Sequence, residues 1–158
     1  MTDLRILPLT PDRLPDYLGF MAGDAFADNP RWASCFCHCF FAARPGKRWE
    51  EWTAEENRAA AGGLIESRRP QGHLAYRGGR VVGWCNATPR PLVPALRDEP
   101  CAEPAQVGAI LCFVVAKPQR GAGVARGLLA LFRAAGFAPH AEDADSVTIR
   151  RRLRATRA

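Results

Sequence analysis

This sequence lacks the features expected of membrane-spanning, secreted or disordered proteins. No apolar run approaches the ~20 residues that a membrane-spanning helix needs. The N-terminal stretch MTDLRILPLT has no long apolar segment behind basic residues, as a secretion signal has. No repeat or long linker divides the chain. With 47% hydrophobic and 24% charged residues among 158, the composition predicts one globular domain. Because neither a membrane span nor a secretion signal is apparent, we expect this domain in the cytoplasm.

Lysine is scarce, since Lys47 and Lys117 are the only two, yet the formal net charge is +6. Arginine therefore carries nearly all of the positive charge. A basic surface can bind nucleic acid, but the arginines are scattered, except for a cluster at Arg150–Arg152 and Arg154. We interpret this cluster as the end of a last strand and its solvated tail, and we expect neither a nucleic-acid nor a membrane partner. The positive field suits a small anion with several phosphates.

The six cysteines occur without a secretion signal, so we expect reduced thiols. Cys35, Cys37 and Cys39 alternate with Phe36 and His38. In an extended segment the three thiols would share one face, and the histidine would point to the other. Zinc sites usually bring sulfurs together from C-x₂-C spacing. We therefore predict small buried side chains and no metal, with a cysteine-based metal or redox protein as the lesser alternative.

The most informative stretch is LCFVVAKPQRGAGVA, from Leu111 to Ala125. An apolar run is followed by a glycine turn, and a helical pattern begins at Val124. The first N–H groups of a helix have no partner within the helix, so such a junction can bind an anion. Gly121 and Gly123 allow backbone amides to approach a phosphate closely. The loop alone is equally consistent with an α/β domain in which a glycine turn precedes a helix and no ligand binds.

The residues from Arg120 to Ala125, RGAGVA, match the pattern R/Q-x-x-G-x-G/A. They resemble the pyrophosphate loop of the GNAT N-acetyltransferases, which use acetyl-CoA. The stretches AYRGGRVVGWCNATPR and TAEENRAAAGGLIESR resemble the central hairpin of that fold and the helix before it. The resemblance implies an α+β fold with three α/β/α layers around a mixed, mostly antiparallel sheet. Residues 1–158 would then form a single N-acetyltransferase domain that acetylates a small-molecule or peptide amine without a metal.

The resemblance also implies which residues contact acetyl-CoA. The thioester is expected beside the fourth strand, where backbone N–H groups would stabilise the developing oxyanion. The arginine adds a forked cation suited to phosphate oxygens. The expected contact residues are Phe113, Val114 and Val115 on the strand, and Arg120, Gly121, Ala122, Gly123, Val124 and Ala125 in the loop and helix start.

The chain departs from the family after this loop. GVARGLLA resembles the start of the helix after the loop, and LFRAAGF resembles the end of the next helix. They join at Ala130-Leu131, so the fifth strand and parts of two helices are missing. The missing region commonly supplies a tyrosine that protonates the departing thiolate, and Tyr17 and Tyr76 do not lie there. We expect a fold truncated after the pyrophosphate loop, with impaired activity. The alternative is a non-catalytic CoA-binding or structural remnant.

No catalytic residue is assigned from the sequence. A base that deprotonates the amine can be any carboxylate or a water chain. Glu99 and Glu103 precede the fourth strand, and His73 and His38 are equally open candidates. None of the four is favoured by its spacing.

The apolar strand at Gly108–Val115 is expected to be central and buried on both faces. Without a fifth strand, its free edge needs a partner. The last strand, Val147–Leu153, or a second chain in a homodimer would supply one. The other expected elements are a strand at 4–7, a helix begun by Thr10 and Pro11 and disturbed by Pro15, a helix from Thr53 to about Arg68, a hairpin at 73–87, a helix from Val124 to Ala135 ended by Gly136, and a closing hairpin at 137–153.

Overall fold

The computed structural model describes residues 3–42, 47–69, 72–142 and 147–150. A four-stranded sheet of order β1-β2-β3-β4 occupies its centre, and each neighbouring pair of strands is antiparallel. The strands are β1 (Leu4–Pro8), β2 (Gly72–Arg77), β3 (Arg80–Pro89), β4 (Gly108–Val115), β5 (Ala138–Glu142) and β6 (Val147–Arg150). The α-helices are α1 (Leu14–Ala22), α2 (Ala54–Glu66) and α3 (Val124–Ala134).

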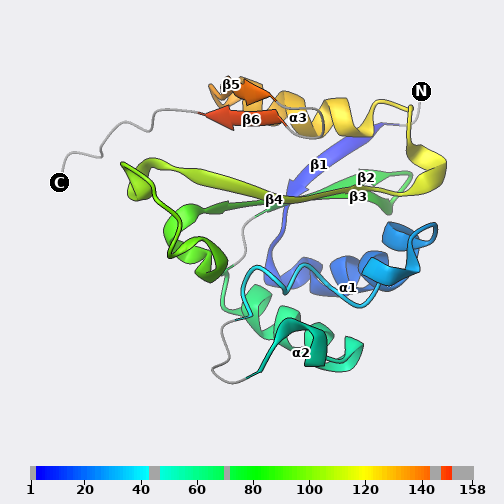
Figure 1. Ribbon diagram of the computed structural model, residues 1–158. Helices are drawn as coiled ribbons and strands as arrows, with labels where there is room; N and C mark the ends of the chain where they lie inside the picture. Colours follow the sequence, from blue (N-terminus) through cyan, green and yellow to red (C-terminus); the bar gives the residue numbers. More distant parts are fainter. Residues whose placement is uncertain (1–2, 43–46, 70–71, 143–146, 151–158) are drawn as a thin grey trace.

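Helices cover both faces of the sheet, which confirms the expected three α/β/α layers. Figure 1 shows α1 and α2 on one side and α3 on the other, together with β5 and β6. Trp84 and Met21 are fully buried in the core on the α1–α2 side. Leu128 is fully buried in the second core, beneath α3. The sheet thus separates two hydrophobic cores.

The expected central hairpin is present as β2 and β3. Gly78 and Gly79 form its turn with φ of +57° and +77°, values that glycine adopts without steric cost. Gly72, at the start of β2, is needed for a different reason. A Cβ atom at this position would lie 2.4 Å from the Trp84 ring, so the close packing of this tryptophan requires glycine.

The start of α2 agrees with the sequence prediction, whereas the start of the first helix differs from it. The predicted capping box of α2 is confirmed, because Glu56 N–H donates to Thr53 Oγ1 at 3.1 Å and Thr53 N–H donates to Glu56 Oε2 at 2.9 Å. Thr10 instead precedes a short 3₁₀ turn and makes no side-chain cap bond. Pro15 does not disturb α1, since it lies in the first turn, where a missing N–H breaks no helical bond.

The position of β4 differs from the expected central strand. Within the described residues, β4 lies at the edge of the sheet, next to β3 alone. Its side chains Ile110 and Phe113 are 39% and 41% exposed. The physical reason is that no fifth strand covers this side of β4 in the described part of the chain. The prediction of a strand from the apolar composition is confirmed, and the prediction that this strand is central is wrong.

The closing hairpin does not supply the missing neighbour. β6 pairs with β5 in a separate two-stranded sheet, so the expectation that the last strand pairs with β4 is wrong for residues 147–150. The expected turn at 143–146 and the strand end at 151–153 lie outside the described residues. A second chain that covers the edge of β4 remains a prediction.

The two helix fragments recognised in the sequence form one continuous helix, α3. Val124, Leu128 and Phe132 recur every four residues and are buried, as an amphipathic helix requires. Gly136 follows the helix with φ of +87°, the conformation of a glycine that ends a helix. The junction at Ala130-Leu131 therefore lies inside regular helix, which explains how the chain dispenses with a strand there.

Candidate active site

The loop between β4 and α3 has the geometry of an anion-binding helix start. Gly121 and Gly123 have φ of +77° and +82°, and Gly123 is the N-cap of α3. The first hydrogen bond along the helix runs from Gly127 N to Gly123 O, at 2.9 Å. The amides of the three residues between these two are therefore not used inside the helix. The positive end of the helix dipole lies at the same place.

Arg77, at the end of β2, fixes the shape of this loop. Its guanidinium donates to Gln119 Oε1 at 2.7 Å and to the backbone oxygen of Ala122 at 2.9 Å. The second bond holds a loop carbonyl toward the hairpin. Sequence reasoning missed this role, because Arg77 stands in a turn-like RGGR stretch 45 residues from Ala122 and no local signal marks it.

A groove of about 440 Å³ lies beside the loop. The end of β4 forms one wall, and the segment after α1 forms the other. It brings together five of the nine residues predicted to contact acetyl-CoA. The lining residues are Ala25, Phe26, Asp28, Asn29, Phe113, Val114, Val115, Arg120 and Ala125.

The other four predicted residues lie in the adjoining loop and at the helix start. Gly121, Ala122 and Gly123 are exposed and connect Arg120 to the start of α3. The side chain of Val124 is buried, with 1% exposure, and packs close to Gly83. Val124 can therefore offer only its backbone amide to a ligand.

Arg120 already has a protein partner in the groove. Its guanidinium donates to both carboxylate oxygens of Asp28, at 2.5 and 3.1 Å, and to the backbone oxygen of Val115 at 3.1 Å. The bond from Arg120 holds the pKa of Asp28 below its ordinary value. No local pattern predicts this pair, because Asp28 is 92 residues away in a stretch without a recognisable motif.

The fold, loop and groove agree with one family comparison. A model of the acetyltransferase (GNAT) family matches residues 29–146. The chain belongs to this family. A search of the curated proteins finds no significant match to the sequence.

Solved structures support the fold of this GNAT family member. An aminoglycoside acetyltransferase from an uncultured soil metagenomic sample has TM-score 0.52 and 20% identity, covering 85% of this chain and 72% of that one. A proposed acetyltransferase from Pyrococcus horikoshii has TM-score 0.52 and 12% identity, covering 95% and 97%. A ribosomal-protein-alanine N-acetyltransferase from Brucella melitensis biovar Abortus 2308 has TM-score 0.50 and 14% identity, covering 85% and 72%.

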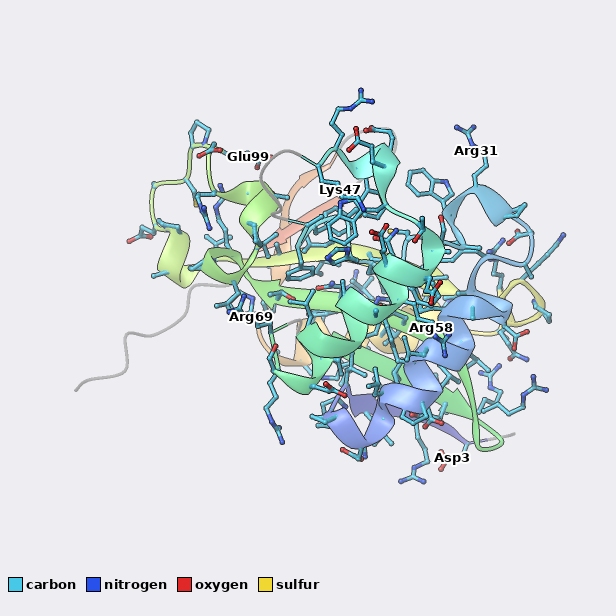
Figure 2. All side chains as sticks on the ribbon, turned by 90° about the horizontal axis from the view of Figure 1, so that it is seen from below. Asp3, Arg31, Lys47, Arg58, Arg69 and Glu99 are labelled. Carbon is cyan, nitrogen blue, oxygen red and sulfur yellow. The ribbon has the colours of Figure 1, made fainter. Side chains whose placement is uncertain are left out.

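None of the four candidate bases lines the groove of this GNAT protein. Glu99 forms a 3.6 Å ion pair with Arg90 at the periphery of the molecule (Figure 2). Glu103 lies in the exposed loop before β4. His73 lines a different cavity of about 400 Å³, next to the end of α3, and burial lowers its pKa.

His38 is part of the packing between α2 and the cysteine segment. Its Nδ1 lies 2.9 Å from Asn57 Oδ1, and both side chains are buried. The Trp52 ring packs edge-on at 4.7 Å from the imidazole. Lys47, labelled in Figure 2, lies over the same tryptophan, with Nζ 4.7 Å from the Trp52 ring centroid. His38 is therefore held in the core and away from the groove.

Both tyrosines are engaged elsewhere. Tyr17 is 2% exposed and donates its hydroxyl to the backbone oxygen of Phe36 at 2.7 Å. Tyr76 donates to Asp16 Oδ2 at 2.7 Å, and burial raises its pKa. Neither lines the groove. Neither tyrosine of this chain therefore lies where the expected tyrosine proton donor would have to be.

The cysteine segment is folded rather than extended, which corrects the expected alternation. Phe36 and Cys37 have φ of +45° and +50°, so the backbone turns back on itself. Cys35 and Cys39 consequently lie with their sulfurs 3.5 Å apart, while Cys37 accepts a hydrogen bond from the Trp84 indole at 3.2 Å. The three thiols therefore do not share one face.

The described residues contain neither a metal-binding cluster nor a helix that could span a membrane. No group of three or more histidine, cysteine, aspartate or glutamate side chains there could hold a metal ion. No helix in the described ranges is long and apolar enough to cross a lipid bilayer.

Proposed function

We propose that this chain is an N-acetyltransferase that takes an acetyl group from acetyl-CoA and transfers it to a small-molecule or peptide amine. The groove between the end of β4 and the segment after α1 is the observation that supports this most strongly. It joins an exposed strand edge to a helix N-terminus and an arginine. A thioester with a diphosphate needs these features together.

We assign the diphosphate to the loop and the start of α3. The amides of Val124, Ala125 and Arg126 form the positive end of the α3 dipole, and Gly121 and Gly123 have no Cβ to obstruct a phosphate. In each case a Cβ built on the glycine would meet nothing within 4 Å. A hydrogen bond to a charged oxygen contributes roughly 1.5–3 kcal/mol. Three or four such bonds account for binding of an anion without a metal.

The thioester arm is assigned to the edge of β4 at Phe113, Val114 and Val115. In the transfer itself, the uncharged nitrogen of the amine attacks the thioester carbonyl carbon, and a C–N bond forms as the C–S bond breaks. The amine loses one proton, and the departing thiolate gains one. Backbone N–H groups at this edge would stabilise the oxyanion that develops. We name no side chain as the base or the acid.

A non-catalytic remnant that binds CoA is the second candidate. The absence of a tyrosine from the groove and the lack of a second neighbour for β4 among the described residues support this candidate. In both proposals, the active transferase and the CoA-binding remnant, residues 1–158 form one N-acetyltransferase domain. They differ in turnover, not in the location of the ligand.

The test begins with calorimetric titration of CoA into the parent protein and a Gly123→Glu variant. The new carboxylate would stand where the phosphates are proposed, so affinity should fall at least about tenfold, or ~1.4 kcal/mol. Gly79→Glu is the matched control, because it adds the same charge at a similar positive φ with open space around it. Equal CoA affinity in the Gly123→Glu variant and the parent would exclude the loop from the site.

Turnover is then measured as thiol release from acetyl-CoA with a panel of amines. Amine-dependent release supports the transferase, whereas CoA binding without release supports the remnant. A parent protein that neither binds CoA nor releases thiol would contradict both.

A further inference from the structure

We propose that Asp28 sets the affinity of the groove for its cofactor by competing with the diphosphate for Arg120. This inference rests on the proposed function, because it concerns the same groove. In the absence of a ligand, Asp28 occupies the guanidinium. When a diphosphate binds, Arg120 exchanges the carboxylate for phosphate oxygens, and the wall of the groove that carries Asp28 is released.

The geometry of the pair supports competition. Both carboxylate oxygens of Asp28 are engaged, at 2.5 and 3.1 Å from the two terminal guanidinium nitrogens. An arginine uses this same forked arrangement for a phosphate. While Asp28 holds one N–H of each terminal nitrogen, a phosphate cannot use that same forked pair of donors.

The pair also connects the two walls of the groove. Asp28 belongs to the segment after α1, which forms one wall, and Arg120 is tied to β4 by its Nε bond to Val115 O at 3.1 Å. Asp28 and Arg120 are the charged side chains among the described residues that line the groove. The ion pair thus spans the place where the proposed ligand enters.

The surroundings make the exchange feasible. Asp28 and Arg120 side chains are 25% and 49% exposed, and an ion pair so open to water contributes little to stability. A diphosphate carries more charge than a carboxylate and gains the amides at the start of α3 as well. Lys117 is a second cation whose charge lowers the pKa of Asp28, so the released carboxylate keeps a favourable neighbour.

The experiment is a double-mutant cycle measured by calorimetric titration with CoA. The four proteins are the parent, Asp28→Asn, Arg120→Gln and the double variant. Protein concentrations are chosen high enough for millimolar dissociation constants to be measured. We expect Asp28→Asn to bind CoA about fivefold more tightly, the upper range for an exposed ion pair. In the Arg120→Gln background, the same substitution should have no effect, because no competition remains.

Asp24→Asn is the control for a general loss of negative charge. Asp24 lies in the same segment but pairs with Arg80 at 3.4 Å and does not line the groove. Its CoA affinity should match the parent. Asp28→Ser provides a second removal of the carboxylate, and it should repeat the gain seen with asparagine if both variants unfold at the parent temperature.

The outcomes separate this inference from the proposed function. No CoA binding by the parent overturns the function and the inference with it. CoA binding by the parent with no gain in Asp28→Asn overturns the inference alone. A gain that persists in the Arg120→Gln background also overturns it, because through-space repulsion between Asp28 and the phosphates would then explain the effect.

Discussion

The indole Nε1–H of Trp84 donates to the sulfur of Cys37, 3.2 Å away, and so joins β3 to the cysteine segment. Both side chains are buried, at 0% and 4% exposure. Tyr17 packs edge-on against the same indole, with ring centroids 5.0 Å apart. Hydrogen bonding with Cys112 and burial raise the pKa of the Cys37 thiol, which keeps it protonated at neutral pH.

Cys37→Ala should destabilise the protein by about 1–3 kcal/mol, because it leaves the buried indole N–H without an acceptor. Urea unfolding followed by tryptophan fluorescence measures the change. Cys101→Ala is the control, since Cys101 lies half-buried in the loop before β4. Equal free energies of unfolding in the two variants would contradict a structural role for the bond.

The pair of thiols formed by Cys35 and Cys39 should lose its first proton near neutral pH. The bond from Cys39 lowers the pKa of Cys35 to about 7, while the same bond raises the pKa of Cys39. Thiolate absorbance in the ultraviolet, recorded against pH, measures this. Cys39→Ala should move the transition toward the ordinary thiol value of ~8.5, and an unchanged transition would argue against the pair.

The same pair predicts how stability depends on pH. Because the folded pKa of Cys35 lies below its unfolded value, the thiolate stabilises the folded state above the unfolded pKa, and this contribution is lost as the pH falls through about 7. The free energy of unfolding should thus rise between pH ~7 and ~8.5. In Cys35→Ala the rise should be smaller; a rise as large as in the parent would exclude this origin.

We expect the protein to contain no stoichiometric metal, as the spacing of the cysteines predicts. In the folded segment, Cys37 accepts a hydrogen bond from Trp84, and no group of three or more histidine, cysteine, aspartate or glutamate side chains among the described residues could hold a metal ion. Elemental analysis after gentle purification is the measurement. One zinc per chain that is lost in a Cys37→Ser variant would show that this prediction is wrong.

Arg77→Gln should weaken CoA binding about threefold to tenfold by releasing the Ala122 carbonyl, a loss comparable to one hydrogen bond of ~1 kcal/mol. Arg80→Gln is a matched control from the other side of the same turn, where Arg80 is exposed and pairs with Asp24. Calorimetry with CoA and thermal unfolding are measured on both variants. An affinity loss of the same size in both would contradict a specific role of Arg77 in the loop.

Turnover of acetyl-CoA should be low in the chain as it stands. Inserting a strand and helix segment from a family member between Ala130 and Leu131 should raise the rate, because it restores a neighbour beside β4. This junction lies within α3, so circular dichroism must first show that the inserted protein folds. The comparison is thiol release by both proteins with the same amines. Full activity without the insert would show that the missing strand is dispensable.

The sequence by itself determined the elements whose signals are local. The capping box of α2, the glycine turn between β2 and β3, and the amphipathic face of α3 all depend on residues a few positions apart. The phosphate loop belongs to this group, because Gly121 and Gly123 lie beside the helix start that they serve. The direct junction of two helix patterns at Ala130-Leu131 is also a local feature of the sequence.

Only the tertiary structure decided which distant residues meet. Asp28 with Arg120, Arg77 with Ala122, and Cys37 with Trp84 are separated by 92, 45 and 47 residues. The apolar composition of β4 could not distinguish a central strand from an edge strand, because that depends on which neighbours pack beside it. Such contacts follow from how the layers pack together, and no local pattern of residue types encodes them.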